Sequence, residues 1–406
     1  MTHKLSYLGI CAVAWLVADL LFPPLIRLAR RLGALDKPGG HKAQREPVPF
    51  LGGFGIFIAL TATLLLTLRF EHIDKWLPLA GIPLGGLFVL GIGLLDDWRP
   101  VNAVLKLLLL FIGSLIVLAF GVGATLFPGP WGIVPNIVIS MLWIAGVTSA
   151  MNSLDNTDGA AGGVAAIAAA GVCLLSLTQP EVVDQPYILA LAFALLGTCM
   201  AFLRYNWPRA RIYLGDNGSF FLGFTLACTL LFAGWNTDPV RAAITPVILL
   251  TVPLLDLGLS TILRYKSGVV KTWRQAVVYC GHDHLAHRLH ALGFSRVGAT
   301  VILWTVSALA AVEALILCSV RSGMLFWCVL GGHALFVLTF SLILARAPVY
   351  TRAERADPVV PAEELPRCLS SHLTVLLRPE GSLEGARRTP EAISPQEASL
   401  GEITVL

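Results

Sequence analysis

Residues 131–159 have the sequence WGIVPNIVISMLWIAGVTSAMNSLDNTDG. The apolar part, 131–150, is long enough to cross a hydrocarbon core of about 30 Å as a helix. The polar part that follows places Asn152, Asp155 and Asp158 three residues apart, so one helical turn would put them on one face. The stretch therefore predicts a membrane-spanning helix that ends in a cluster of oxygen-bearing side chains.

The same succession of apolar stretch and polar loop runs through most of the chain. Of its 406 residues, 56% are hydrophobic and only 13% are charged, against roughly 25% charged in soluble domains. The sequence predicts an all-α, polytopic membrane protein with about eleven transmembrane helices. The candidate spans are 6–27, 51–69, 76–95, 103–120, 131–150, 160–178, 187–204, 218–235, 241–263, 298–319 and 325–345.

Basic residues are distributed unevenly between the two sets of loops. Loops 28–50, 96–102, 205–217 and 264–297, taken with the adjoining span ends, hold seventeen Lys and Arg residues, whereas the opposite side holds five. This asymmetry predicts that the first set of loops is cytoplasmic. Their positive charge suits anionic reactants, and anionic membrane lipids would be attracted as well.

The chain divides by composition into two parts. Residues 1–345 hold all the candidate spans and form the expected membrane-embedded catalytic domain. Residues 346–406 are polar, rich in proline and mixed in charge, which predicts a disordered cytoplasmic tail that the chemistry does not need.

An acidic pair follows the third candidate span. Asp96 and Asp97 are adjacent, and Lys106 lies nine residues beyond Asp97, inside the next span. Adjacent carboxylates repel one another, so one of them tends to hold a proton, or a cation lies nearby. The pair suits a general base or a magnesium site, and Lys106 would pair with a phosphate or with Asp97. A solvated helix end is the plain structural alternative.

Two further polar segments offer oxygen ligands. Asn152, Asp155 and Asp158 suit magnesium or ribose hydroxyls. Asp216 lies in Gly215-Asp-Asn-Gly-Ser219, which opens the eighth candidate span and places a carboxylate beside free backbone N–H groups at a helix start. Such a turn is a natural phosphate and metal site. A helix N-cap explains Asp158 equally well, and a capped loop is the alternative for Asp216.

Two loops carry basic and histidine side chains suited to anions. The loop at 36–53 holds Lys42 and Arg45 among three prolines and four glycines, a composition that excludes a helix and predicts a shaped turn. A positive-inside linker is the alternative there. The last loop holds His284, His287 and Arg288. Arginine can bind phosphate bidentately, and no further ligands at zinc-like spacing accompany the two histidines.

These segments resemble, in the same order, the motifs of the polyprenyl-phosphate N-acetylhexosamine-1-phosphate transferase family, of the glycosyltransferase 4 type. The resemblance covers residues 15–297. It favours the N-acetylglucosamine-type branch, because the run of three histidines typical of the muramoyl-pentapeptide branch is absent. The matching segments are 36–53, Gly93-Leu-Leu-Asp96-Asp97 with Lys106, Asn152-x-x-Asp155-x-x-Asp158-Gly159, Arg211-Ile-Tyr-Leu-Gly-Asp216-Asn-Gly-Ser219, and His284-Leu-Ala-His287-Arg288-Leu followed by Leu292-Gly-Phe-Ser295.

The resemblance implies a magnesium-dependent phosphoglycosyltransferase of the bacterial inner membrane, with its active site facing the cytoplasm. Such an enzyme takes N-acetylhexosamine 1-phosphate from a UDP-N-acetylhexosamine and transfers it to undecaprenyl phosphate. The products are UMP and a lipid-linked sugar diphosphate, which initiates a cell-envelope glycan such as lipopolysaccharide or teichoic acid.

The resemblance also implies roles for single residues. Asn152 and Asp216 would hold Mg²⁺, and Asp96 or Asp97 would orient or deprotonate the lipid phosphate. Phosphate oxygens would be held by Lys106, His287 and Arg288, and the uridine by Asp158 with Lys42. Arg45, Asp155 and His284 complete the expected substrate-binding set. All of these segments are expected to converge at the inner leaflet.

Two other functions remain open on the residues alone. An intramembrane prenyltransferase also grips a diphosphate with aspartate-rich loops and magnesium, but 97–101 lacks the second acid of an Asp-x-x-x-Asp cluster. A transporter would bury its charges near mid-bilayer, whereas these charges lie at one membrane face. No nucleic-acid partner is expected, and a homodimer remains open.

Overall fold

The computed structural model of this chain describes residues 2–36, 46–67, 73–178, 186–232, 238–279 and 281–350. Lys42 and Arg45 lie outside these ranges, as does 351–406, the greater part of the expected tail. The predictions made for them therefore stay predictions.

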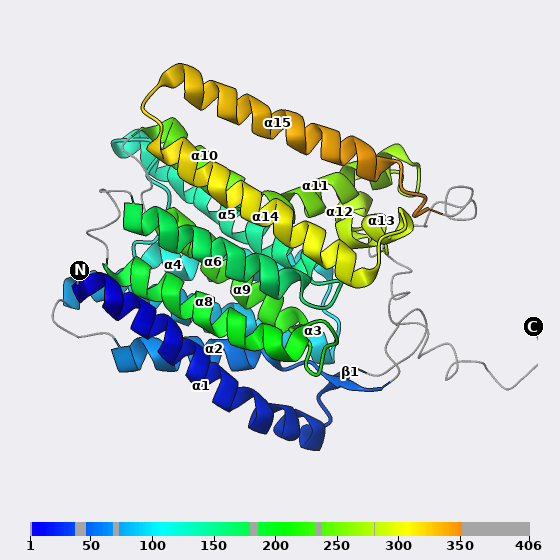
Figure 1. The fold of residues 1–406 in the computed structure, drawn as a ribbon, viewed down its shortest axis with the longest axis horizontal. Coiled ribbons are helices and arrows are strands. Elements are labelled where there is room, and N and C mark those ends of the chain that lie inside the picture. Colours follow the sequence, from blue (N-terminus) through cyan, green and yellow to red (C-terminus); the bar gives the residue numbers. More distant parts are fainter. Residues whose placement is uncertain are drawn as a thin grey trace, which may run out of the picture. The chain divides into compact units, whose positions relative to one another are not determined.

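Ten of the eleven apolar stretches each form one helix over most of their described residues, and the ninth, 241–263, forms two (Figure 1). Two further short helices, two short strands and a short 3-10 turn, Pro130–Gly132, are the other regular elements of the described residues. The elements are α1 Thr2–Leu32, β1 Leu35–Asp36, β2 Val48–Pro49, α2 Gly52–Thr67, α3 Ile73–Trp98, α4 Ala103–Ala119, α5 Ile133–Leu154, α6 Ala160–Thr178, α8 Pro186–Asn206, α9 Gly215–Phe232, α10 Pro239–Leu249, α11 Thr251–Lys266, α12 Trp273–Val278, α13 Leu285–Ala291, α14 Arg296–Ser319 and α15 Gly323–Ala345.

Fewer of these helices are long enough to span a membrane than the sequence predicts. Seven described helices qualify by length and composition, and the pair α10 and α11 would make an eighth. α2 has 16 residues and α4 has 17, so both are short. The structure supports a multi-pass membrane protein, but the count of about eleven spans is not confirmed.

The ninth candidate span is broken in the middle. α10 ends at Leu249 and α11 begins at Thr251, and the two helices meet at 75°. Pro253 lies in the first turn of α11, where its missing N–H is tolerated, whereas within a continuous helix it would remove a hydrogen bond. The break directs α11 toward the polar loops that follow it.

α9 lies inside the helix bundle, and every residue from 217 to 230 is buried. It packs against α2, α3 and α5. A helix that is apolar all round is expected in such a place. α15 is the opposite case: it lies at an edge of the described helices (Figure 1), and only 11% of its span is buried.

Two glycines allow backbone-to-backbone contact at the start of α9. A Cβ atom on Gly53 of α2 would lie 2.0 Å from the Cα of Gly218, and one on Gly93 of α3 would lie 2.4 Å from the Cα of Asn217. Real Cβ contacts are essentially never this short, so no other residue fits without a shift of the backbone. These contacts bring α2 and α3 directly to the Gly-Asp-x-Gly-Ser turn.

The loop expected to be a shaped turn is closed at its base by an antiparallel strand pair. Leu35 pairs with Pro49, and Asp36 pairs with Val48. The second strand also binds the segment before α9, because the Tyr213 N–H donates to the Pro49 carbonyl at 2.7 Å. The loop base is thus held beside the start of α9.

Candidate active site

The site is built around Asp216, in the first turn of α9. Gly215 starts this helix with a φ of 74°, which a side chain would strain. Asn152, in the last turn of α5, donates from its side-chain nitrogen to the Asp216 carboxylate at 2.8 Å. The same amide lies 2.9 Å from the Ser219 hydroxyl. The end of α5 and the start of α9 are therefore joined through the amide of Asn152.

Asp97, at the end of α3, caps the start of α9. Its carboxylate accepts the backbone N–H groups of Asp216 at 2.9 Å and of Asn217 at 3.1 Å. It also accepts from the Asn217 side chain at 2.6 Å. The first N–H groups of a helix have no partner within the helix, and a negative charge there is favourable to the helix dipole. Both oxygens of Asp97 are thus committed to holding the turn that carries Asp216.

Asp96 faces the cation of α4 instead. Its carboxylate accepts from the Lys106 ammonium at 2.5 Å and from the Val101 N–H at 2.7 Å. The carboxyl groups of Asp96 and Asp216 also lie within hydrogen-bond contact of each other. Two carboxylates this close require a proton or a cation between them. The sequence offered Asp97 or a phosphate as the partner of Lys106, and the structure gives it Asp96.

The donor set at this point fits Mg²⁺. Among the described residues no three His, Cys, Asp or Glu side chains are grouped so as to hold a metal ion. Magnesium does not need such a group, because it commonly uses one or two carboxylates, several waters and the substrate's phosphates. Asp216, its neighbour Asp96 and the amide of Asn152 supply that kind of set.

Asp155 and Asp158 lie on the loop that leaves α5. Burial, followed by the nearby carboxylates of Asp97 and Asp158, raises the pKa of Asp155 to about 8. Asp158 accepts the Ala210 N–H at 3.1 Å, so it ties this loop to the segment before α9. The structure thus places Asp155 near Asp97, and Asp158 beside the chain segment that leads into Asp216.

His284 is held against α5 by Asp256, which is fully buried. The Asp256 carboxylate accepts from the Ser153 hydroxyl at 2.8 Å and from the Leu285 N–H at 2.6 Å, and it lies 2.9 Å from Nδ1 of His284. Ser153 follows Asn152 directly in the sequence. The broken span therefore supplies the carboxylate that binds the last loop to the site.

His287 and Arg288 lie on the short helix α13. Burial, with the neighbouring His282 and His284, lowers the pKa of His287 to about 4, so its imidazole is neutral at physiological pH. Arg288 donates to the Tyr350 hydroxyl at 2.8 Å. The hydrogen bonds of Arg288 therefore run to the end of the described chain rather than to the carboxylates of α3 and α9.

Sequence reasoning brought most of this site together but missed several partners. The structure places Asp96, Asp97, Lys106, Asn152 and Asp216 in direct contact through side chains or the turn between them. The sequence did not predict the roles of Ser153 and Asn217, although both residues lie inside the quoted motifs. The sequence also showed no sign of a role for Tyr350, which lies in the segment expected to be a disordered tail.

The comparison with known proteins agrees with the geometry. The family model described as glycosyl transferase family 4 matches residues 79–234, which include Asp96, Asp97 and Asp216. A putative glycosyltransferase of Streptomyces coelicolor is 31% identical over 342 residues, covering 83% of this chain and 75% of the relative. The chain belongs to glycosyl transferase family 4. The resemblance seen in the sequence motifs is thereby confirmed.

Two other relatives of this family 4 protein carry more specific names. A probable undecaprenyl-phosphate N-acetylglucosaminyl 1-phosphate transferase of Bacillus subtilis is 26% identical over 327 residues, covering 78% of this chain and 87% of its own. A decaprenyl-phosphate N-acetylglucosaminephosphotransferase of Mycobacterium tuberculosis is 28% identical over 331 residues, covering 74% and 80%.

Proposed function

We propose that this family 4 protein transfers N-acetylhexosamine 1-phosphate from a UDP-sugar to undecaprenyl phosphate, with Mg²⁺, at the cytoplasmic face of the bacterial inner membrane. The observation that carries the proposal is the meeting of Asp96, Asn152 and Asp216, from three different helices, beside the Lys106 ammonium. The names of the relatives support a polyprenyl phosphate as acceptor and favour N-acetylglucosamine as the sugar. The product would initiate a cell-envelope glycan.

The reaction exchanges one phosphoanhydride for another. An oxygen of the lipid phosphate attacks the phosphorus that carries the sugar, the bond from that phosphorus to the bridging oxygen breaks, and UMP leaves with the bridging oxygen. Such a transfer needs positioning and charge neutralisation more than covalent catalysis. Mg²⁺ held by Asp216 and Asn152 would neutralise charge on the donor's diphosphate.

The two adjacent aspartates take different parts in this proposal. Both oxygens of Asp97 bind the start of α9, so we assign Asp97 to orienting Asp216 rather than to proton transfer. Lys106 keeps Asp96 as partner, and its side chain is 26% exposed, which leaves the ammonium free to meet a phosphate oxygen as well. A general base is not required, because a phosphate with a second pKa of about 6 is mostly dianionic at pH 7.

The remaining substrate contacts follow from position and charge. Neutral His287 would donate a hydrogen bond to a phosphate oxygen, and Arg288 would supply positive charge to the same group. Asp158 would bind the uridine with Lys42, and Arg45 would lie on the same loop as Lys42. Asp155, which lies near Asp97, and His284, which is held by Asp256, would complete the substrate-binding set.

The direct test is a donor panel with the purified protein. We expect release of UMP and formation of a lipid-linked sugar from UDP-N-acetylglucosamine and undecaprenyl phosphate, lost on chelation and restored by Mg²⁺. A prenyltransferase would form a prenyl product without UMP, and a transporter would form no covalent product. Absence of UMP with every UDP-N-acetylhexosamine in the panel would end the proposal.

A further inference from the structure

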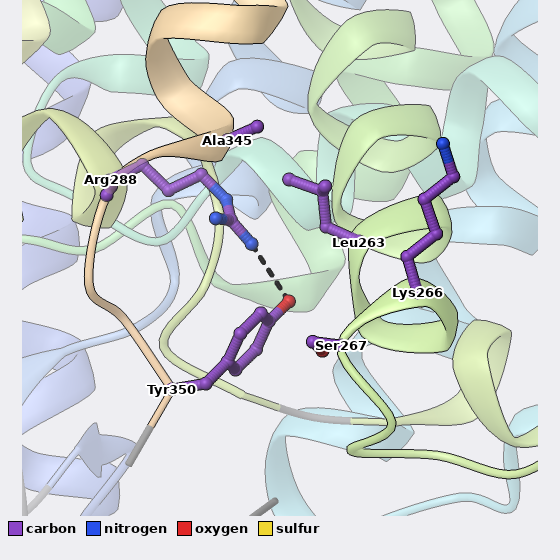
Figure 2. A pocket seen from close by; sticks show the side chains of 7 residues that line it. Leu263, Lys266, Ser267, Arg288, Ala345 and Tyr350 are labelled. Atoms are coloured by element: carbon purple, nitrogen blue, oxygen red, sulfur yellow. Dashed lines mark hydrogen bonds between the residues drawn. The ribbon is translucent and has the colours of Figure 1, made fainter. Parts of the chain in front are cut away.

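The chain after α15 turns back onto the last loop. Tyr350, five residues beyond the end of α15, accepts a hydrogen bond from Nη2 of Arg288 at 2.8 Å and donates one to the Asp283 carboxylate at 2.7 Å. Figure 2 shows the tyrosine hydroxyl pointing at the arginine, and the Arg288 Cζ lies 5.3 Å from the centre of the tyrosine ring. The hydroxyl therefore bridges a cation and an anion.

Asp283 is paired more closely with Arg264 than with Arg288. Asp283 receives two hydrogen bonds from the Arg264 guanidinium, at 2.8 and 2.7 Å, whereas Arg288 approaches it no closer than 4.0 Å. All three side chains are almost fully buried, with exposures of 1 or 2%. Bidentate pairing binds Asp283 to Arg264. Arg288 therefore shares the carboxylate of Asp283 with Arg264 and has the longer contact to it.

The tyrosine stays neutral in this group. Burial and the adjacent Asp283 raise the pKa of Tyr350 above its usual value. A neutral hydroxyl has one proton to donate, and Asp283 can only accept, so the lone pairs are left for Arg288. The direction of both hydrogen bonds is thereby determined, and with it the orientation of the guanidinium.

A cavity lies beside Arg288, so the hydrogen bond to Tyr350 is needed to hold the guanidinium in one orientation. Its volume is about 230 Å³, and its walls include Leu263, Ser267 and Ala345 as well as Tyr350 (Figure 2). The buried Nε of Arg288 has no hydrogen-bond partner among the described residues. Space on one side and an unpaired donor would allow the guanidinium to rotate. Among the described residues, the side-chain hydrogen bond that opposes such rotation is the one from Arg288 to Tyr350.

We propose that Tyr350 is a positioning residue, which holds Arg288 in the orientation that presents its charge to a phosphate group of the substrate. The inference rests on the proposed function, because it takes that phosphate to belong to the UDP-sugar. It also moves residues 346–350 from the expected tail into the catalytic body.

The test replaces the hydroxyl alone in the full-length protein. Tyr350→Phe keeps the ring and its contact with Arg288. We expect the KM for the UDP-sugar to rise roughly tenfold, the size of a lost hydrogen bond to a charged group, with kcat changed less than about twofold. Tyr265→Phe is the matched control, because Tyr265 is 41% exposed and stacks on Trp273, and its KM should stay at the wild-type value.

A double-mutant comparison separates positioning from a general structural role. If Tyr350 acts through Arg288, Tyr350→Phe should change KM no further in an Arg288→Ala background. An equal rise of KM in both backgrounds, or no rise in either, would overturn the inference.

A binding measurement keeps the inference distinct from the reaction itself. Inorganic pyrophosphate should raise the Tm of the purified protein, by less in Tyr350→Phe and by least in Arg288→Ala. Equal shifts in the wild type and Tyr350→Phe would contradict the positioning role even if no UDP-sugar is turned over. An inactive wild type with graded pyrophosphate shifts would instead contradict the proposed function alone.

Discussion

The Asn152 side-chain amide donates to the Asp216 carboxylate across 2.8 Å, although the two residues are 64 positions apart. The bond joins the end of one helix to the start of another. The Asp216 carboxyl group that accepts this bond also has the carboxyl group of Asp96 as a neighbour. The proposed metal ligands are therefore held in place by the protein itself, which is the arrangement that a preorganised site requires.

The first prediction concerns the proposed metal ligand. Asp216→Asn removes the charge but keeps the shape, so the protein should stay folded in membranes while turnover falls by at least about a hundredfold, as for the loss of one electrostatic contact to the reacting group. UMP release across a Mg²⁺ titration measures the effect. Asp238→Asn is the control, since Asp238 caps α10 and its side chain is 50% exposed. Normal turnover by Asp216→Asn would remove the metal assignment.

The second prediction concerns the contact between α2 and α9. Gly53→Ala places a methyl group 2.0 Å from the Gly218 Cα, so the helices must separate and the Asp216 turn must move. We expect a large loss of Tm and of activity. Gly91→Ala is the control within α3, where no atom lies within 4 Å, and it should be neutral or stabilising by about 0.5–1 kcal/mol. Equal Tm values for the two variants would show that the contact is not required.

The third prediction concerns Asp256, which binds the last loop to α5. Asp256→Ala leaves the buried Leu285 N–H and the Ser153 hydroxyl without their acceptor, at a cost of about 1–3 kcal/mol for each group. Thermal unfolding in detergent should show a clear fall in Tm, together with reduced turnover. Asp19→Asn breaks a more exposed pair with Arg204, for which about 0–1 kcal/mol is expected. Equal losses in the two variants would argue against a special role for Asp256.

The fourth prediction is a pH dependence. The pKa of Asp155 is raised to about 8 in the folded protein, against about 3.9 in the unfolded chain. Between these values the folded state binds more protons, so this group's contribution to stability is complete below about pH 4 and is lost as the pH rises through 8. With chelator present, Tm should fall between pH 6 and 8.5 more steeply for the wild type than for Asp155→Asn. Parallel curves would contradict the assignment.

The positions of the helices and of the polar segments follow from local sequence. Apolar length and basic-residue bias are properties of contiguous stretches, and the stretch 131–159 by itself shows where a helix ends and a cluster of oxygen-bearing side chains begins. The order of the motifs was sufficient to recognise the family. The bend between α10 and α11 was not foreseen, because hydropathy over 241–263 is continuous and does not report the direction of the axis.

The pairing of the side chains was decided only by the tertiary structure. The sequence did not decide between Asp96 and Asp97 for the lipid phosphate, and it offered Asp97 as the partner of Lys106. The folded protein gives Asp96 to Lys106 and Asp97 to the start of α9. Such a distinction depends on the rotation of each helix and on the closeness that Gly53 and Gly93 permit. Tyr350 reaches Arg288 for the same reason: 62 positions separate them, and no local pattern records which distant segments the packing of helices brings together.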